Sequence, residues 1–202
     1  MRKRMYKPEQ QNENKETFLR LLRSVDRKGI ENLIDYLETK TDFFTAPAST
    51  RYHNNCLGGL LAHTLNVYEN FKAQLQLREI DLPEESIILT SLLHDICKCN
   101  YYVLEQRNRK VNGKWEQYDV WSNTKAVSPP LPHSYRSIRM IGTFLRLTPS
   151  EELCIYYHMG PYGGEDYEYR NLLQKVNTDY PETLLFYIAD LSATYLDEVM
   201  YE

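Results

Sequence analysis

The segment 83–96 constrains the fold of this chain more than any other. Pro83 is a residue favoured in the first turn of a helix, and the carboxylates of Glu84 and Glu85 suit the positive end of a helix. Apolar residues then recur on nearly every side of the helix: Ile87, Ile88, Leu89, Leu92, Leu93 and Ile96. A helix that is apolar all round is buried among other elements. We therefore predict a helical domain built around this segment.

The same segment ends in the pair His94–Asp95, within the run Ser-Leu-Leu-His-Asp-Ile-Cys-Lys. An ionised carboxylate in apolar surroundings is costly unless it is paired or bound to a cation. A divalent metal would accept one imidazole nitrogen and one carboxylate oxygen from this pair. A His–Asp hydrogen bond that only orients the two side chains is the alternative, and the pair by itself favours it.

Two other apolar helical segments carry a polar group that needs a ligand or a partner. His63 follows the pair Gly58–Gly59 and has leucines as its near neighbours, and Asp190 lies in the run Tyr-Ile-Ala-Asp-Leu. Three helices that each bring imidazole or carboxylate groups inward can build a metal site in a helical domain. His63, His94, Asp95 and Asp190 are therefore candidate metal ligands.

The order of these motifs resembles the HD superfamily of metal-dependent phosphohydrolases. Gly-Gly-Leu-Leu-x-His-Thr, Leu-Leu-His-Asp-Ile-x-Lys and Ala-Asp-Leu follow one another over roughly residues 42–197. The resemblance implies an all-α HD-domain helical bundle with a metal at the four candidate ligands. It also implies that the chain is an enzyme, a phosphoric ester hydrolase that uses a metal-activated water.

Two further histidines extend the resemblance. In HD members with two metals, two histidines lie between the His-Asp pair and the last aspartate, and His133 and His158 occupy those places here. Ligation of a second metal and contact with substrate remain equally open for both. One subgroup, found largely in bacteria and phages, has a glycine, an acid and a lysine around the first of these histidines. This chain keeps only a basic residue there, Arg136, so the role of the acid is not carried over.

The predicted ligands are imidazoles and carboxylates, without a thiolate. This set suits one or two divalent ions of manganese, iron, magnesium, cobalt, nickel or zinc. Asp95 and Lys98 are the predicted catalytic residues: Asp95 holds the attacking water, and Lys98 matches the family's His-Asp-x-x-Lys. Lys98, Arg136 and Arg51 are candidate phosphate-binding residues. A solvated surface cation is the alternative for each of them.

The apolar pattern also predicts how the rest of the chain is organised. Between Tyr101 and Trp121 it alternates loosely, and Asn112–Gly113 is a turn signal, which predicts a β-hairpin around residues 101–122 inserted in the helical domain. Residues 1–14 are expected to form a flexible N-terminal tail, and residues 15–202 a single HD-type domain. Further helices are expected at 16–28, 30–37, 59–71, 133–145, 149–158 and from 181 to 195.

Composition limits the partners that we expect. A net charge of −4 argues against an extended nucleic-acid footprint, and no apolar stretch is long enough to span a membrane. The basic N-terminus lacks the apolar run of a secretory signal, which favours a cytoplasmic location. The chain contains 17 tyrosines, and aromatic faces near a phosphate site suit a nucleobase. The expected substrate is a small phosphorylated compound, a nucleotide or short oligonucleotide.

Three other functions fit parts of the pattern. A 3′–5′ exoribonuclease would need a nucleic-acid module that the residues before position 42 cannot supply. A non-catalytic HD-fold module that binds a ligand is disfavoured by the intact ligand set, and a di-iron HD oxygenase is not excluded by it. His53 carries no family role: it either bonds a backbone group at the loop bend or lines the pocket. The sequence indicates no oligomeric state.

Overall fold

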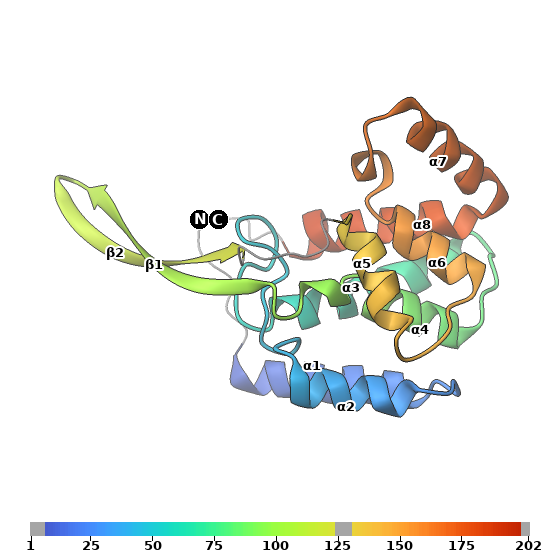
Figure 1. The fold of residues 1–202 in the computed structure, drawn as a ribbon, viewed down its shortest axis with the longest axis horizontal. Coiled ribbons are helices and arrows are strands. Elements are labelled where there is room, and N and C mark those ends of the chain that lie inside the picture. The colour runs from blue at the N-terminus through green and yellow to red at the C-terminus, as the bar shows by residue number, and fades with distance from the viewer. Residues whose placement is uncertain (1–6, 124–130, 199–202) are drawn as a thin grey trace.

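The structure is a computed structural model that describes residues 7–123 and 131–198 (Figure 1). Within these ranges the chain is mostly helical, with one two-stranded antiparallel sheet. The helices are α1 (Pro8–Arg23), α2 (Ile30–Lys40), α3 (Gly59–Leu77), α4 (Glu84–Leu93), α5 (His133–Ile141), α6 (Pro149–Tyr157), α7 (Tyr167–Asp179) and α8 (Pro181–Ser192). Short 3₁₀ turns cover Ile96–Lys98 and Gly160–Gly163, and a π-helical turn covers Ala193–Asp197. The strands are β1 (Tyr102–Val111) and β2 (Lys114–Asn123).

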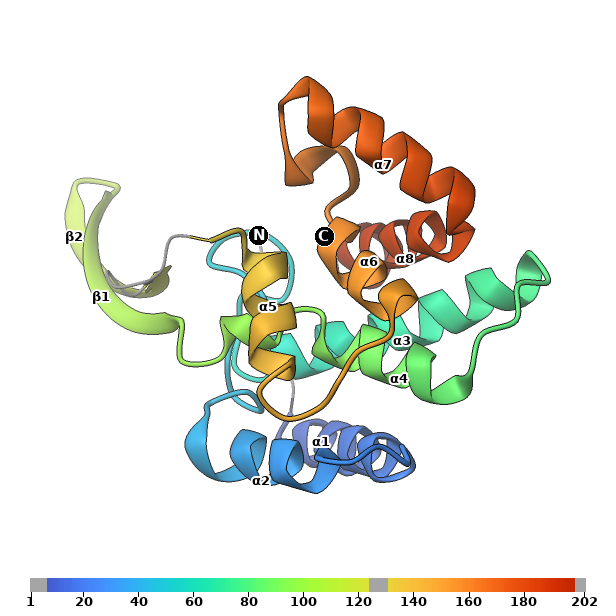
Figure 2. The same ribbon diagram turned by 45° about the vertical axis from the view of Figure 1, so that its right-hand side comes forward.

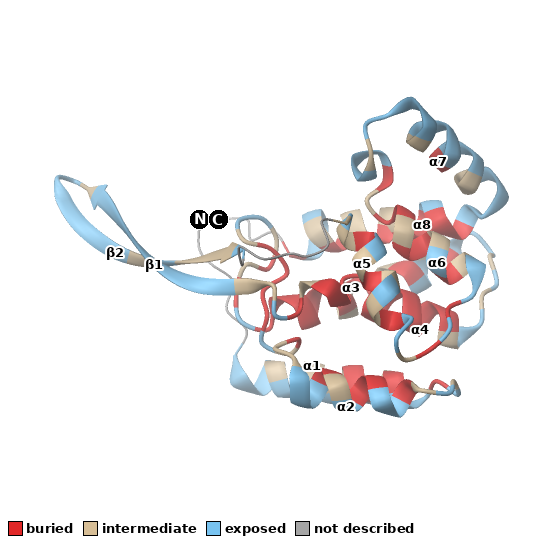
Figure 3. Cartoon of the chain, in the orientation of Figure 1, coloured by how far each residue is buried: buried red, intermediate tan, exposed pale blue. Residues whose placement is uncertain are grey.

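Helix α4 lies in the centre of the helical body, as its apolar sequence predicts. Every residue from Ser86 to Leu93 is buried. Helix α3 packs against α4 on one side and α8 on another, while α1 and α2 form a pair that covers the bottom of the body in the view of Figure 2. The buried residues concentrate where these helices meet (Figure 3). The expected helical fold with an inserted hairpin is therefore confirmed.

A buried ion-pair network ties the turn after α1 to the N-termini of α4 and α6. The Arg27 guanidinium donates to both carboxylate oxygens of Glu151, at 2.6 and 2.7 Å, and to Glu85 at 2.8 Å. Glu151 is almost fully buried and also accepts from the Ser86 hydroxyl at 2.6 Å. Three helices and a turn are thus held together by one set of charge-assisted bonds.

Several helix boundaries differ from those predicted: α1 ends at Arg23, before position 28, and α2 and α3 continue to Lys40 and Leu77. Helix α1 begins at Pro8, so residues 8–14, expected in the loose tail, are helical; Pro8 occupies the first turn and Glu9 suits the positive helix end. Helix α4 ends at Leu93 because the His94 ring nitrogen Nδ1 bonds the Ser91 carbonyl oxygen at 2.9 Å. Helix α5 ends at Ile141, before the expected position 145.

Helix α7 was not among the predicted helices. Leu173 is the one buried residue of this helix within the described chain, so the helix has little of the apolar periodicity that identifies a helix in sequence. Its start is fixed locally, since the Asp166 carboxylate accepts from the Tyr169 amide at 2.7 Å. The helix lies at the edge of the body (Figure 1); it packs mainly on α8, and its Tyr169 ring also lies 5.4 Å from that of Tyr157 on α6.

The predicted hairpin is present and extends away from the helical body (Figure 1). Its strands pair without interruption from Tyr102↔Asn123 to Val111↔Lys114. Asn112 and Gly113 form the turn with positive φ angles of 50° and 84°, as an Asn-Gly hairpin turn requires. No helix within the described residues has both the length and the apolar character needed to cross a membrane.

Candidate metal centre

Six predicted ligands from five parts of the chain meet at the centre of the helical body. His63 comes from α3 and Asp190 from α8, while His133 begins α5. The others lie just beyond helix ends: His94 and Asp95 follow α4, and His158 follows α6. His94 keeps helical backbone angles (φ −54°, ψ −33°) and Asp95 departs from them (φ −110°, ψ 17°), and both side chains face the same centre.

The first group of ligand atoms consists of His63, His94 and Asp95, all buried and all within 4.8 Å of one another. Asp95 Oδ2 lies 3.3 Å from His94 Nε2 and 3.8 Å from His63 Nε2. Asp190 joins this group through His63, whose Nε2 lies 3.1 Å from Asp190 Oδ1. This group can hold a metal ion, with Asp190 placed at its edge.

The second group consists of Asp95, His133 and His158, and it meets the same criterion. Nε2 of each histidine lies 3.9 Å from Asp95 Oδ1, and the two Nε2 atoms are 2.9 Å apart. Oδ1 of Asp95 therefore faces the second group while Oδ2 faces the first. One carboxylate between two sets of imidazoles is suited to bridge two ions.

The buried histidines are held in the tautomer that metal binding needs. Nδ1 of His94 is 2.9 Å from the Ser91 carbonyl oxygen, and Nδ1 of His158 is 2.7 Å from the Ile155 carbonyl oxygen. Each Nδ1 must donate, which leaves a lone pair on Nε2. Burial lowers the pKa of His158 to about 3, so its ring is neutral and its Nε2 is free to accept.

Two acceptor atoms at this centre are buried without any hydrogen-bond partner: Nε2 of His94 and Oδ1 of Asp95. Buried polar atoms are nearly always satisfied, and an orphaned pair is costly in a folded protein. Cations bound at the two groups would satisfy both atoms. The donor set and these two atoms therefore fit a divalent metal.

Glu198 is a residue that the sequence analysis missed. Its buried carboxylate accepts from His63 Nδ1 at 3.0 Å and from the Asn66 amide at 3.0 Å. A carboxylate on the far nitrogen of a ligating histidine orients the ring and strengthens its other nitrogen as a donor to metal. No sequence pattern pointed to it, since it lies beyond α8, directly after the π-helical turn Ala193–Asp197.

The carboxylates around His63 remain ionised. Burial by itself would lower the pKa of His63, but Glu198 and Asp190 outweigh it and raise that pKa to about 10. Burial alone would also raise the pKa of Asp190, but its bond with His63 holds the pKa well below the usual range. Charge on both acids is the state in which they bind a cation.

Lys98 lies beside Asp95. Its ammonium nitrogen lies 2.6 Å from Asp95 Oδ2, and its side chain is 16% exposed. Burial by itself would lower the pKa of Lys98, but the charge of Asp95 raises it above the usual value. The exposed fractions of Asp190 and His133, 15% and 31%, exceed those of the other ligands. These three partly exposed side chains mark the open side of the centre.

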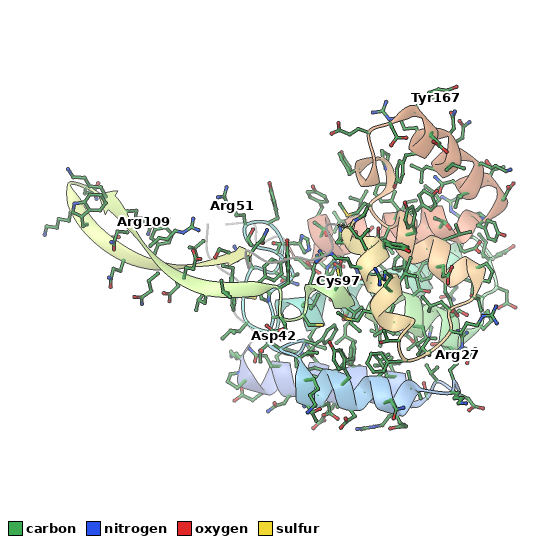
Figure 4. The ribbon with its side chains drawn as sticks, in the orientation of Figure 1. Arg27, Asp42, Arg51, Cys97, Arg109 and Tyr167 are labelled. Atoms are coloured by element: carbon green, nitrogen blue, oxygen red, sulfur yellow. The ribbon has the colours of Figure 1, made fainter. Side chains whose placement is uncertain are left out.

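The two arginine candidates differ in their surroundings. Arg136 lies on α5, with its guanidinium 5.0 Å from the centre of the Tyr101 ring. Arg51 is exposed on the loop before α3 and points away from the body (Figure 4). Arg136 is therefore close to the segment that follows Lys98, while nothing in the described structure connects Arg51 with the centre.

His53 lines the centre instead of bonding the loop backbone. Its ring centre lies 4.7 Å from that of His63, and its Nε2 is buried without a hydrogen-bond partner. Burial lowers the pKa of His53 to about 4, so the ring is neutral. Of the two alternatives from sequence, lining the pocket agrees with this position.

Comparison with known proteins gives one similarity to a characterised enzyme. Over 81 residues the chain is 32% identical to a dihydroneopterin 2′,3′-cyclic phosphate phosphodiesterase of Methanocaldococcus jannaschii. The chain is similar to a phosphodiesterase. The matched region covers 38% of this chain and 30% of that enzyme, so most of the relative has no counterpart in the alignment. No protein-family profile and no solved structure matches the chain.

Proposed function

We propose that this chain is a metal-dependent phosphohydrolase of the HD type. Buried histidine and aspartate groups that can hold a metal, together with similarity to a phosphodiesterase, support a hydrolase of phosphate esters. The observation that carries the proposal is the pair of orphaned acceptors, His94 Nε2 and Asp95 Oδ1. A structural His–Asp pair would bond to itself and would leave neither atom without a partner.

The proposal assigns a ligand role to each residue of the centre. His63, His94, Asp95 and Asp190 would hold one divalent ion, and His133 and His158 would hold a second that shares Asp95. Such ions lower the pKa of a bound water and polarise the phosphoryl oxygens. Imidazole and carboxylate donors suit manganese, iron, cobalt, nickel, zinc or magnesium.

Two residues of the chain would act on the substrate. Lys98, at the open side of the centre, brings a positive charge that attracts the phosphate and stabilises charge on its oxygens. The Asp95 carboxylate, as a ligand shared by both ions, would also orient the attacking water that they activate. Arg136 is the second candidate for phosphate contact, and Arg51 remains a more distant one.

The substrate is a small phosphorylated compound under this proposal, and a nucleotide is the first class to test. The similar enzyme is named for a 2′,3′-cyclic phosphate, which makes cyclic phosphodiesters the natural first substrates. Nucleoside 2′,3′-cyclic phosphates join that bond to a planar heterocycle, and tyrosines such as Tyr101 lie beside the centre.

The test combines elemental analysis with a hydrolysis screen. The purified chain is expected to contain divalent metal and, once loaded with each metal in turn, to hydrolyse bis(p-nitrophenyl) phosphate and nucleoside 2′,3′-cyclic phosphates. Asp95→Asn is expected to lower kcat/KM by roughly a thousandfold or more, since metal-centre interactions supply several kcal/mol. Asp81→Asn, an exposed carboxylate of the same charge, is the matched control.

The outcomes separate the alternatives. A chain that binds metal but hydrolyses no phosphate ester would be a binding module or an oxygenase, and oxygen consumption distinguishes those two. Release of mononucleotides from the 3′ end of RNA would identify an exoribonuclease. If Asp95→Asn kept both its metal and its activity, the assignment of the centre would be wrong.

A further inference from the structure

The hairpin β1–β2 is the part of the fold that the proposed reaction leaves unexplained. Each strand has ten residues, so the ribbon reaches about 30 Å from base to tip. Most of its residues are exposed, and its outer half lies clear of the helical body (Figure 3). A two-stranded ribbon alone in water is only marginally stable. Both faces are open to a partner.

The outer half of the ribbon is cationic in an acidic chain. Residues 107–118 carry four basic side chains and one carboxylate, a formal charge of +3, whereas the whole chain has a net charge of −4. Arg109 is 3.9 Å from Glu116, a weak exposed pair, and its guanidinium points outward at the far end of the ribbon (Figure 4). Among the described residues, no carboxylate pairs with Lys110 or Lys114.

Two aromatic rings lie on one face of the ribbon together with Lys110, whereas Arg107, Arg109 and Lys114 lie on the other face. Trp115 lies directly opposite Lys110 near the tip and is 72% exposed. Side chains two residues apart share a face, so Trp121, opposite Leu104, lies on the same side nearer the base. Trp115 is exposed and Trp121 is half-buried, and rings separated along a ribbon in this way are suited to stack on bases.

The base of the ribbon lies next to the metal centre. Tyr102, the first residue of β1, follows Lys98 by four residues and pairs with Asn123 at the end of β2. Tyr101 lies under the Arg136 guanidinium, 5.0 Å from it. Aromatic rings therefore recur from Trp115 at the tip through Trp121 to Tyr102 and Tyr101 at the base, whereas the cations are confined to the two ends, with Glu105 and Asp119 between them.

We propose that the hairpin is an arm that binds single-stranded nucleic acid and leads its phosphodiester backbone to the metal centre. The cations contact phosphates, and Trp115 and Trp121 stack with bases, the combination by which proteins hold single strands without reading sequence. The binding half of this proposal stands on the hairpin alone, and the delivery half rests on the proposed hydrolase. The overall acidity that argues against a large footprint does not argue against a local one of about five nucleotides.

Binding is tested with the full chain and labelled single-stranded RNA and DNA of about ten nucleotides, by fluorescence anisotropy over a range of salt. Lys110→Ala/Lys114→Ala is expected to weaken binding about tenfold at low salt. The slope of log K against log salt concentration should become shallower by roughly 1.4, because two phosphate contacts are lost. Trp115→Ala is expected to weaken it about 5- to 150-fold. The matched control is Lys40→Ala/Lys175→Ala, which removes the same charge from exposed positions elsewhere.

A second measurement separates delivery from the chemistry. The tip variants are expected to keep the wild-type kcat/KM on bis(p-nitrophenyl) phosphate and to raise KM on the oligonucleotide, with circular dichroism confirming their fold. Asp95→Asn is expected to bind the oligonucleotide normally and to cleave nothing.

Three results would overturn the proposal. The first is that the wild-type chain hydrolyses the small substrate but binds neither oligonucleotide. The proposed hydrolase would then stand, and the nucleic-acid arm would be wrong. The second is equal loss of binding in the tip and control variants, which indicates nonspecific charge. The third is loss of self-association in the tip variant, by light scattering, without loss of oligonucleotide binding; the hairpin would then contact a second copy. Oligonucleotide binding by a chain that hydrolyses nothing would refute the hydrolase and the delivery step alone.

Discussion

The contact between Glu198 and His63 yields the sharpest quantitative prediction for the metal centre. Glu198→Gln keeps the size and shape of the side chain and removes its charge. The amide oxygen of the glutamine can still accept from His63 Nδ1 and from Asn66, because both donors approach the same oxygen, Oε1. The substitution therefore tests the carboxylate charge rather than the packing.

The size of the effect follows from that geometry. A buried hydrogen bond to a charged group contributes about 1.5–3 kcal/mol, and a neutral bond about 0.5–1.5 kcal/mol. The difference, about 1–2 kcal/mol, corresponds to a metal Kd raised roughly 5- to 30-fold. Loss of an outer carboxylate typically weakens metal affinity about 10- to 100-fold, which agrees with this value.

Competition against a chromophoric chelator measures the metal Kd without reference to any substrate. The control is Asp197→Asn, one residue away, whose exposed carboxylate accepts from Asn70 at 2.6 Å instead of from a predicted ligand. We expect the control to bind metal as the wild type does. A Glu198→Gln variant whose Kd stayed within about twofold of the control would refute the assignment of Glu198 as the residue that positions His63.

Four further outcomes concern stability. Arg27→Ala should lower the free energy of unfolding, measured in urea, by about 3 kcal/mol, because it leaves the Glu151 carboxylate buried without its cation. Arg23→Ala is the control: it removes an exposed ion pair of 3.7 Å and should lower that free energy by less than about 1 kcal/mol. Burial alone would raise the pKa of Glu151, but its bond with Arg27 lowers it below 4.5, so its stabilisation is full above about pH 4.5. Urea midpoints should therefore fall as the pH drops below that value. Gly59→Ala should cost about 2–4 kcal/mol, since a Cβ there collides with the Asn54 carbonyl. Chelation of metal held at about 100 times its Kd should lower Tm by roughly 5–10 °C.

The sequence predicted the parts of this centre that lie on apolar helices. His63 and Asp190 stand out because they interrupt apolar runs, and His94–Asp95 because they end the most apolar helix in the chain. His133 and His158 follow from motif order, since their local sequence carries no such contrast. The structure brings all six together, while their roles as ligands remain predictions.

Glu198 and His53 show where sequence patterns lose information. Both lie in segments without apolar periodicity, and each reaches the centre through a change in backbone geometry: a π-helical turn before Glu198 and the loop before α3 for His53. Helix α7 was missed for a related reason. Its position depends on a local cap and on its contact with α8, and neither leaves a repeating apolar pattern.

The end of α4 links the fold of this chain to its chemistry. His94 has helical backbone angles, and Asp95 leaves them at the point where both side chains reach the centre. The bond from the His94 ring to the Ser91 carbonyl replaces a backbone bond at that point and fixes the ring with Nε2 toward Asp95. The same geometry leaves Nε2 of His94 and Oδ1 of Asp95 without partners, a cost to the protein without metal. Binding of a cation would remove that cost, so metal affinity and folding stability should change together in any variant that alters this turn.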